Sequence, residues 1–516
     1  MSSSRLALII PSLQFFEKAI SVAPLTAPGQ THIVRRDQPG IEIRMSRSYL
    51  VVSDLHLCDV EDHADGWKAY KGSRYLFDGE FAALLADFRA RAEPGAELSL
   101  ILNGDIFDFD LVSAVPAEPP WPVSPAERYR GLRSTAAKSA WKLSLILSCH
   151  GWFVLALADW LRAGHRLVYV LGNHDREFHF PEVRQILLDQ LHLAARGEGG
   201  DFSDEQVCFE PWFFHRAGEI YAEHGQQYDY YSTFRNVLCP TVEGREGPML
   251  ALPMGNLSNR YLMTRMGYFN PFATDYIRNL FSYLWHWLRF YAFRRRSLAV
   301  AWAWGSMVVL GKLLATKKRL LRSPRACREE MAAAGARAGL ADAVVEKIAA
   351  LQRPPITNRV YRMAREFWLD RLALFVLMVG GTIALALVPV PLWLKLMVPL
   401  ACFPLLFFLY ETFAHGETVF GVEREFPRVA HQLAMLLDTP VIAFGHDHVP
   451  RLLPIDSRIT FVDTGTWAPI YDEAGRLLPG YRNFLEAHFR PGRRAEVFLG
   501  SWMGADLSRP DPSPGP

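Results

Sequence analysis

The sequence predicts an α/β fold whose chain is interrupted by a long, mostly helical insertion. Short apolar runs alternate with helical stretches from residue 48 to about residue 229, and the same pattern returns at residues 441–444 and 459–462. Between these zones the pattern changes to long uncharged runs flanked by basic residues. Because alternating strand and helix patterns indicate an α/β architecture, we expect the insertion to divide one folded domain into two stretches of sequence.

The predicted domain boundaries follow these changes of pattern. The tail is rich in Pro and Ser and has too few apolar residues to order itself, so it is predicted to be disordered. The segments are an N-terminal extension (1–45), the first part of the α/β domain (46–245), the insertion (246–425), the second part of the domain (426–503) and the tail (504–516).

Three strands are expected at residues 49–53, 98–102 and 167–171, because each is a compact apolar run that ends at polar residues. In an open α/β sheet the chemistry lies outside the carboxyl ends of the strands. The loops after these strands are therefore where functional residues are expected. Within the insertion, residues 328–352 indicate an Ala-rich helix pair with breaks at Gly335 and Gly339.

The overall composition excludes some classes of protein. The chain has 516 residues, half of them apolar, and a formal net charge of +2, so a large core is expected and nucleic acid is not an expected partner. Its six cysteines include no CxxC pair, which argues against a zinc ribbon and a disulfide framework. We interpret them as reduced thiols of a protein that faces the cytosol.

The insertion contains the strongest apolar signal of the chain. Residues 372–410 carry a single charge, Lys395. Because a membrane-spanning helix needs about 20 apolar residues, this length predicts a transmembrane hairpin with its turn at Pro389 and Pro391. A buried helical hairpin in a soluble cap is the alternative, since an apolar run can also form a core helix.

Five short motifs in the α/β stretches contain residues that commonly bind metals. In order they are Asp-Leu-His, Gly-Asp-Ile-Phe-Asp, Gly-Asn-His-Asp, His-Gly and Gly-His-Asp-His. Carboxylate, amide and imidazole ligands without thiolates suit two divalent cations, with manganese favoured over iron or zinc, and a carboxylate such as Asp105 is the natural bridge between them. The candidate metal ligands are Asp54, His56, Asp105, Asn173, His224, His446 and His448.

These motifs, in this order, resemble those of the calcineurin-like metallophosphoesterases over roughly residues 46–240 and 425–500. The resemblance implies a β-sandwich flanked by helices, with a dinuclear metal site that hydrolyses phosphate esters. The implied ligands of the first cation are Asp54, His56, Asp105 and His448, and those of the second are Asp105, Asn173, His224 and His446.

The same resemblance implies roles for residues beside the metals. His174 would donate a proton to the departing alkoxide, with Asp108 as its family-type carboxylate partner and Asp175 as the adjacent alternative. Arg176 would contact a substrate phosphate, although an arginine at a helix start is more often solvated or salt-bridged. The turn at residues 463–467 departs from many relatives, which have Asn there, so its role stays open.

The position of the motifs also constrains the topology. Because ligands on both sides of the insertion must surround the same metals, the chain must cross any bilayer an even number of times. The aromatic stretch at residues 276–293 is expected to lie on the membrane surface. Arginines gather at the entry to the hairpin, which places the α/β domain in the cytoplasm by the positive-inside rule. They are Arg359, Arg362, Arg365 and Arg371.

The predicted function is therefore the metal-dependent hydrolysis of phosphate esters or pyrophosphates at the cytoplasmic face of a membrane, on a phosphorylated or lipid-linked small molecule. Two motifs, Asp-Leu-His-Leu and His-Gly, resemble in part those of UDP-2,3-diacylglucosamine hydrolases, which are much shorter and commonly have arginine at the position of His174. A nuclease or nucleotide phosphodiesterase of the same superfamily is an alternative. A membrane-anchored, non-catalytic metal-binding scaffold is another, against which the intact ligand set argues.

Overall fold

The computed structural model describes residues 46–268, 270–272, 288, 298–317, 324–367, 369–414, 422–471, 475–478 and 481–502. The predicted N-terminal extension and tail, and the aromatic stretch apart from residue 288, lie outside these residues. The chain divides into two compact units. We call Val22–Ala273, Thr316–Pro355 and Val422–Pro516 the sheet unit, and Met1–Ser21, Thr274–Ala315 and Ile356–Gly421 the helical unit.

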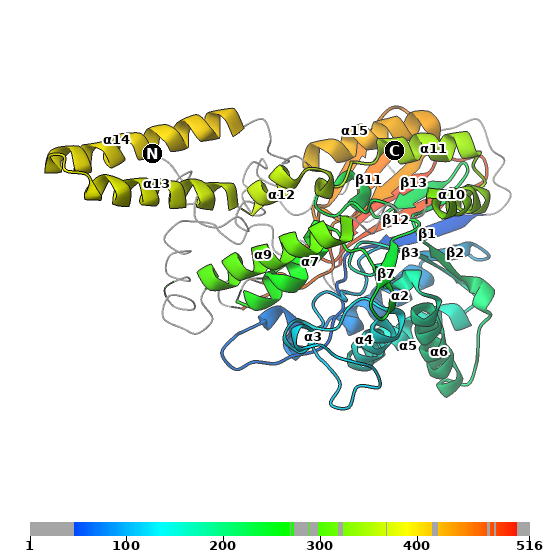
Figure 1. The fold of residues 1–516 in the computed structure, drawn as a ribbon. Coiled ribbons are helices and arrows are strands. Elements are labelled where there is room, and N and C mark those ends of the chain that lie inside the picture. The colour runs from blue at the N-terminus through cyan, green and yellow to red at the C-terminus, as the bar shows by residue number, and fades with distance from the viewer. Residues whose placement is uncertain are drawn as a thin grey trace. The chain divides into compact units, whose positions relative to one another are not determined.

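Two mixed β-sheets form the centre of the sheet unit (Figure 1). In the first sheet, β1 (Arg47–Val52), β2 (Glu97–Asn103), β3 (Arg166–Val170) and β4 (Val207–Glu210) run parallel. The antiparallel strands β12 (Asn483–Phe489) and β13 (Glu496–Ser501) complete it beside β1. The predicted α/β class and the three predicted strands are thus confirmed.

The second sheet has the order β10-β11-β9-β6-β5. Its central strands β6, β9 and β11 run parallel, and β5 and β10 are antiparallel edge strands. The bounds are β5 (Phe213–Arg216), β6 (Ile220–Glu223), β9 (Val441–Phe444), β10 (Arg451–Pro454) and β11 (Thr460–Asp463). A separate hairpin consists of β7 (Thr241–Gly244) and β8 (Gly247–Leu250).

One apolar core lies between the two sheets. It contains Tyr49, Val51 and Ile101 from the first sheet and Ile220 and Val441 from the second. Since alternate residues of a strand point to opposite faces, the intervening residues of β1 face away from this core, yet they are buried as well. Burial of both faces explains why these strands are continuous apolar runs in the sequence. A sandwich of the metallophosphoesterase type stays a prediction.

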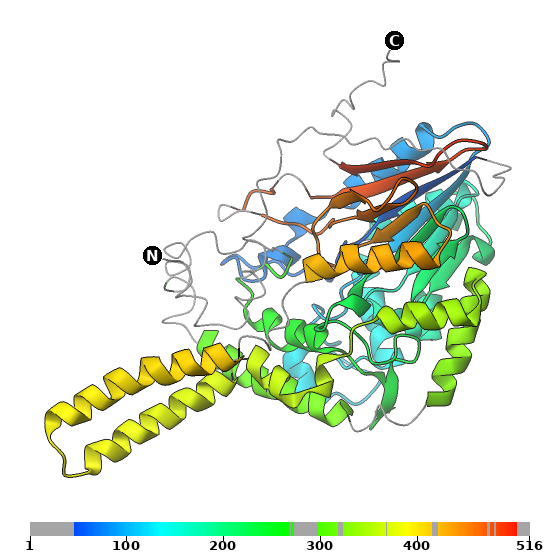
Figure 2. The same cartoon turned by 90° about the horizontal axis from the view of Figure 1, so that it is seen from above.

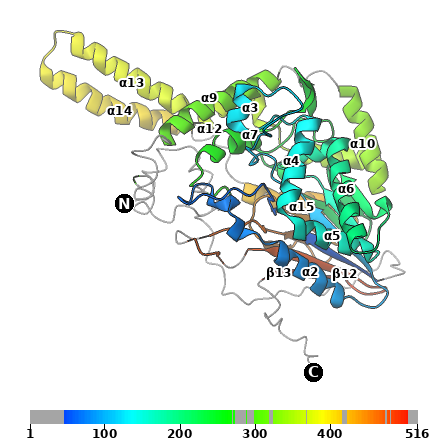
Figure 3. The same ribbon diagram turned by 90° about the horizontal axis from the view of Figure 1, so that it is seen from below.

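Helices cover the sheets. Helices α2 (Asp78–Ala90), α4 (Ala136–Cys149), α5 (Gly151–Arg162) and α6 (Pro181–Gly197) pack on one another (Figure 3). Helices α10 (Pro324–Ala338), α11 (Asp342–Leu351) and α15 (Val422–Leu436) pack through a second apolar cluster that includes residues of β9 and β11. The sheet unit also contains α7 (Met254–Tyr261). The sequence boundaries had assigned α7, α10 and α11 to the insertion.

One of the two predicted helix breaks is wrong. Helix α10 continues through Gly335, where the missing Cβ leaves room for Val345 of α11; an added Cβ would lie 3.0 Å from Val345 Cγ2. Close helix packing, and not a break, therefore accounts for this glycine. Gly339 follows the last helical residue with φ +65°, as expected of a glycine that ends a helix.

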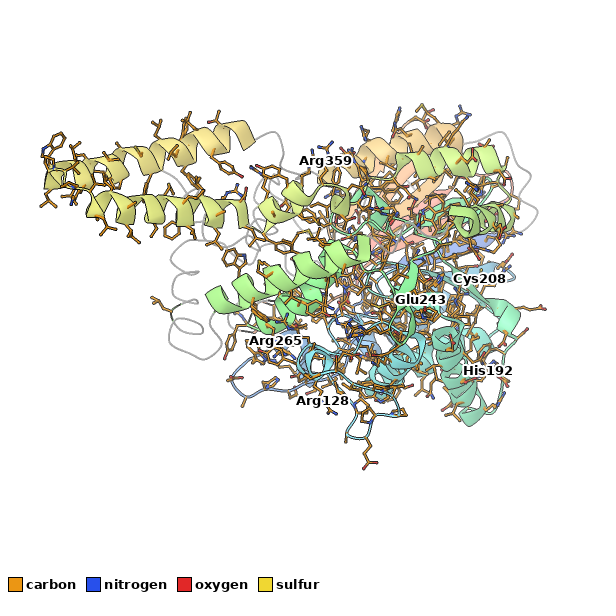
Figure 4. All side chains as sticks on the ribbon, in the orientation of Figure 1. Arg128, His192, Cys208, Glu243, Arg265 and Arg359 are labelled. Carbon is orange, nitrogen blue, oxygen red and sulfur yellow. The ribbon has the colours of Figure 1, made fainter. Side chains whose placement is uncertain are left out.

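The helical unit contains a pair of long apolar helices, α13 (Leu369–Leu387) and α14 (Leu392–Ala414), which lie side by side (Figures 1 and 2). Both are long and apolar enough to cross a membrane, and almost none of their apolar windows is buried. Figure 4 shows their side chains projecting outward along the pair. The connection at residues 388–391 contains both prolines predicted to form the turn, and Lys395 Nζ donates to Ala386 O near it.

Exposure of these side chains contradicts the alternative of a buried hairpin for the residues that the structure describes. Helix α12 (Val360–Glu366) leads into the pair, and Arg359, labelled in Figure 4, immediately precedes it. Helix α9 (Leu298–Lys317) contains a shorter apolar segment, Trp304–Ala315. Membrane association through α13 and α14 thus fits their length, composition and exposure.

Candidate metal centre

All seven predicted ligands lie in loops that follow parallel strands of the sheet unit. The first sheet positions Asp54 and His56 after β1, Asp105 after β2 and Asn173 after β3. The second sheet positions the remaining three after two neighbouring strands, and they are His224 after β6 and His446 and His448 after β9. Because parallel strands end at the same edge of a sheet, residues far apart in sequence meet there.

Six of the seven predicted ligands form two adjoining groups, and within each group the ligand atoms lie within 4.8 Å of one another. The first group is Asp54, His56 and His448, and the second is Asp105, His224 and His446. In the first, His448 Nε2 is 3.2 Å from Asp54 Oδ1. In the second, His224 Nε2 is 3.0 Å from Asp105 Oδ2. Asp105 also forms a group with His56 and His174, so it lies between the two halves, as expected of a bridge.

Each imidazole of the centre has a partner on the ring nitrogen that points away from the other ligands. His224 Nδ1 donates to Asn103 O at 2.9 Å, and His448 Nδ1 donates to Phe272 O at 3.4 Å. Carboxylates hold the other two rings: Asp108 Oδ2 is 3.1 Å from His56 Nδ1, and Asp229 Oδ2 is 3.2 Å from His446 Nε2. Such partners fix the ring orientation and leave the opposite nitrogen for a metal.

The backbone of the centre is strained. Among the described residues, seven that are not glycine have a positive φ, and five of these are predicted ligands: Asp54 (55°), His56 (49°), Asp105 (54°), His446 (78°) and His448 (62°). A left-handed conformation costs roughly 1–2 kcal/mol for a residue with a Cβ. Strain of this kind persists where the surrounding structure enforces it and gathers at functional sites.

The glycine of the Gly-Asp motif is required by close packing. A Cβ on Gly104 would lie 2.5 Å from the His224 ring, and the residue has φ +83°. Gly445 has the same role at the other end of the site, since its Cβ would lie 2.6 Å from Ser53 Oγ. The motif glycines therefore let the ligand loops approach each other.

Among the described residues, several buried polar atoms of the centre make no hydrogen bond of good geometry. They are Asn173 Oδ1, and also Asp54 Oδ1 and His224 Nε2, each of which lies beside another predicted ligand. An unsatisfied buried polar atom is costly and needs an explanation such as an ion. All three are atoms that a transition metal accepts as ligands, so the residues present fit a bound metal ion, and the number of cations stays a prediction.

No family model and no curated protein matches this chain. The motifs and the geometry of the seven side chains are therefore the support for a metal site.

The charges of the ligands are strongly coupled. Burial alone would raise the pKa of Asp105, but neighbouring imidazoles, above all that of His224, hold it well below its usual range. The pKa of Asp54 is lowered in the same way. Burial lowers the pKa of His224, but Asp105 and Asp54 outweigh it and raise the pKa to about 9. The imidazoles thus place positive charge beside the buried carboxylates, and a bound divalent cation would supply positive charge at the same place.

His174, the predicted acid, lies at the edge of the centre with its side chain 14% exposed. Its Nδ1 is 3.3 Å from Asp108 Oδ2 and 3.4 Å from Asp110 Oδ2. Burial lowers the pKa of His174, but Asp108 and Asp105 outweigh it and raise the pKa well above its usual value. Its backbone N–H donates to Asp105 Oδ1 at 2.7 Å, so a hydrogen bond connects the predicted acid to the predicted bridging ligand.

Asp175 has a structural role instead. Its carboxylate accepts hydrogen bonds from Ile106 N, Gly172 N and the Tyr169 hydroxyl, at 2.7–2.9 Å. Burial raises its pKa to about 7. Asp175 therefore joins the loops after β2 and β3, while Asp108 is the partner of His174.

Arg176, the predicted phosphate contact, is fully buried. Its Nη1 donates to Pro211 O at 2.6 Å, and its guanidinium lies over the Phe234 ring at 5.2 Å. Burial lowers its pKa to about 9. A side chain without exposed surface cannot meet a substrate from solution, so we correct both the proposed contact and the expectation of a solvated residue.

The turn at residues 463–467 supports the first ligand loop. Thr464 Oγ1 lies 2.6 Å from Ser53 Oγ, and Thr466 Oγ1 donates to Asp54 O at 2.9 Å. The backbone N–H of Trp467 also donates to Asp54 O, at 3.1 Å. These hydrogen bonds help to hold Asp54 in its left-handed conformation without an Asn in the turn.

Four residues around the centre were missed in the sequence: Asp110, Asp229, Asn256 and Phe272. Asp110 stands two residues after the Gly-Asp-Ile-Phe-Asp motif, so an extended motif would have included it. Asp229 follows the His-Gly motif within the same loop region. Asn256 and Phe272 come from the region assigned to the insertion, and no sequence signal identifies them.

Proposed function

We propose that this protein is a dinuclear-metal-dependent hydrolase of phosphate esters or pyrophosphates. The observation that carries the proposal is the convergence of two ligand groups, from loops up to about 390 residues apart in sequence, around unsatisfied buried oxygen and nitrogen atoms. A structural metal needs one closed site. Two adjoining groups with an acid at their edge suit the in-line displacement that two-metal hydrolases perform.

The ligands divide as follows. Asp54, His56, Asp105 and His448 would hold one cation, and Asp105, Asn173, His224 and His446 the other. Manganese fits the mixed oxygen and imidazole donors best, with iron or zinc as alternatives. When bound, the cations would acidify a water and neutralise phosphate oxygens.

His174 is the group of this chain that would move a proton. Asp108 and Asp110 both approach its Nδ1, which leaves Nε2 for the leaving group. The nearby carboxylates favour the protonated ring, the form that a general acid needs. Its partial exposure allows a substrate to reach it.

We place the reaction at the cytoplasmic face of a membrane. Support comes from the exposed apolar surface of α13 and α14, from the arginines that precede them, and from the six cysteines, which include no CxxC pair. A phosphorylated or lipid-linked small molecule is the expected substrate class. The weak net charge argues against nucleic acid.

The test uses the full-length protein in detergent. We expect the purified protein to bind two equivalents of Mn²⁺ by elemental analysis and to hydrolyse bis-p-nitrophenyl phosphate. His174→Ala should keep both metals and lower kcat by roughly 100-fold, the usual contribution of a general acid. The control is His431→Ala, since this exposed histidine of α15 lies outside the centre.

Other outcomes identify the alternatives. Metal binding without hydrolysis of any phosphate ester or pyrophosphate would favour the scaffold and contradict the proposal. Cleavage of single-stranded or duplex DNA at rates far above those for small esters would favour the nuclease. Absence of bound transition metal would refute the proposal altogether.

A further inference from the structure

Helix α7 presents two buried asparagines to the metal centre. Asn256 and Asn259 are three residues apart, so they share one face of the helix. Asn259 Nδ2 approaches Asp108 Oδ2 at 3.5 Å. Asn256 has no exposed surface and makes closer contacts. A buried amide must satisfy its polar atoms, so the partners of Asn256 are informative.

Asn256 connects Asp110, a carboxylate beside the predicted acid His174, to the loop that contains Asn173. Its Nδ2 donates to Asp110 Oδ2 at 2.6 Å and to Asn173 O at 2.9 Å. Its Oδ1 accepts from Asn173 Nδ2 at 3.4 Å. Asn256 thus contacts the residue beside His174 and the predicted ligand of the second cation at once.

The chemistry of these partners decides which way each amide faces. A backbone carbonyl only accepts hydrogen bonds, so Asn173 O requires the Nδ2 end of Asn256. Oδ1 of Asn256 must then face Asn173, and an oxygen acceptor requires the Nδ2 end of the Asn173 amide. The Oδ1 of Asn173 is left without a hydrogen-bond partner. That oxygen is the atom a metal needs, because an amide nitrogen is not a ligand.

We infer that Asn256 is a positioning residue: through the chain Asp110, Asn256, Asn173 it presents the Asn173 oxygen to the second cation and holds Asp110 beside His174. The inference rests on the proposed function and adds to it a residue from outside the five motifs. Without Asn256, the Asn173 amide is free to turn its nitrogen toward the cation. Asp110, the second carboxylate beside His174, also loses the hydrogen bond that holds it in place.

The test compares Asn256→Leu and Asp110→Asn with the wild type in the full-length protein. We expect Asn256→Leu to bind one of its two Mn²⁺ equivalents at least tenfold more weakly, the usual effect of losing a residue that orients a ligand. Because the acid is less well held, kcat should also fall more steeply across aryl phosphodiesters as the leaving phenol becomes less acidic. Asp110 does not touch Asn173, yet Asp110→Asn should also weaken Mn²⁺ binding and make kcat depend more steeply on the acidity of the leaving phenol.

Further variants separate positioning from simple damage. Ser258→Ala is the control, since Ser258 is buried on the same helix and its hydroxyl has no hydrogen-bond partner; it should behave as wild type. If Asn256 and Asp110 act through one chain of contacts, the variant with both Asn256→Leu and Asp110→Asn should weaken Mn²⁺ binding no more than Asn256→Leu alone. Thermal unfolding in EDTA checks that each variant is folded.

The outcomes are distinct. If wild type binds two Mn²⁺ and is active, while Asn256→Leu keeps the wild-type Mn²⁺ affinity and the wild-type dependence on the leaving group, the inference is overturned and the proposed function stands. If wild type neither binds Mn²⁺ nor hydrolyses an ester, the proposed function itself fails.

Discussion

Replacement of Gly104 by alanine tests whether the glycine at this position is needed to make room for the His224 ring. The residue has φ +83°, and an added Cβ would lie 2.5 Å from two atoms of the His224 ring. The left-handed conformation alone costs alanine about 1 kcal/mol. To restore an ordinary contact of 3.4 Å, the ring must move by about 0.9 Å, and overpacking of this kind costs roughly 1–3 kcal/mol. We therefore expect Gly104→Ala to destabilise the protein by about 2–4 kcal/mol.

The matched control is Gly164→Ala. Gly164 has nearly the same φ, +86°, but an added Cβ would meet nothing within 4 Å, so this variant measures the backbone cost alone. At about 2 °C per kcal/mol, Tm in EDTA should fall by about 2 °C in the control and by about 4–8 °C in Gly104→Ala. Because the displaced ring is a proposed metal ligand, Gly104→Ala should also bind Mn²⁺ at least tenfold more weakly. Equal losses of Tm and of metal affinity in the two variants would refute the reasoning.

Three other predictions concern Asp108, Glu127 and the apolar helix pair. Asp108→Asn should weaken Mn²⁺ binding about 10–100-fold and also lower kcat, because Asp108 holds both His56 and His174; normal metal content would show that it does not orient a ligand. Burial raises the pKa of Glu127, but Lys138 and backbone N–H groups lower it to about 2, so its stabilisation is complete above about pH 4.5 and lost as the pH falls toward 2. Glu127→Gln should therefore lower Tm at pH 7 and flatten the fall of Tm between pH 5 and 3, and an unchanged slope would contradict this. Replacing residues 372–410 with a short Gly-Ser linker should release the protein from membranes with both metals retained, which fractionation and elemental analysis check; persistence in the membrane fraction would contradict the role of α13 and α14.

The clustering of the candidate metal ligands was predictable, because each motif carries its own local evidence. A glycine followed by a carboxylate, amide or imidazole, directly after an apolar run, indicates a tight turn at the end of a strand. The hairpin was predictable for a similar reason, since hydropathy over about 20 residues depends only on local composition. Its turn at Pro389 and Pro391 follows from the residues themselves, because proline disfavours the helical conformation of the residue before it.

Residues whose role depends on distant partners could not be identified in this way. Arg176 stands next to a motif, yet tertiary packing buries its guanidinium on Pro211 O and Phe234. Asp175 was a fair alternative to Asp108 by adjacency alone, but three donors, from β3 and from the loops after β2 and β3, occupy its oxygens. Asn256 has no local signature, because an asparagine in a helix gains its function only from Asp110 and Asn173.

The sequence by itself determined the α/β class, the ligand types and the apolar hairpin, because composition and period are properties of neighbouring residues. Only the tertiary structure decided which carboxylate faces which imidazole. Those contacts join the two sheets, as between Asp54 in the loop after β1 and His448 in the loop after β9. Contacts between such distant residues depend on the path of the backbone and leave no periodic trace in the sequence.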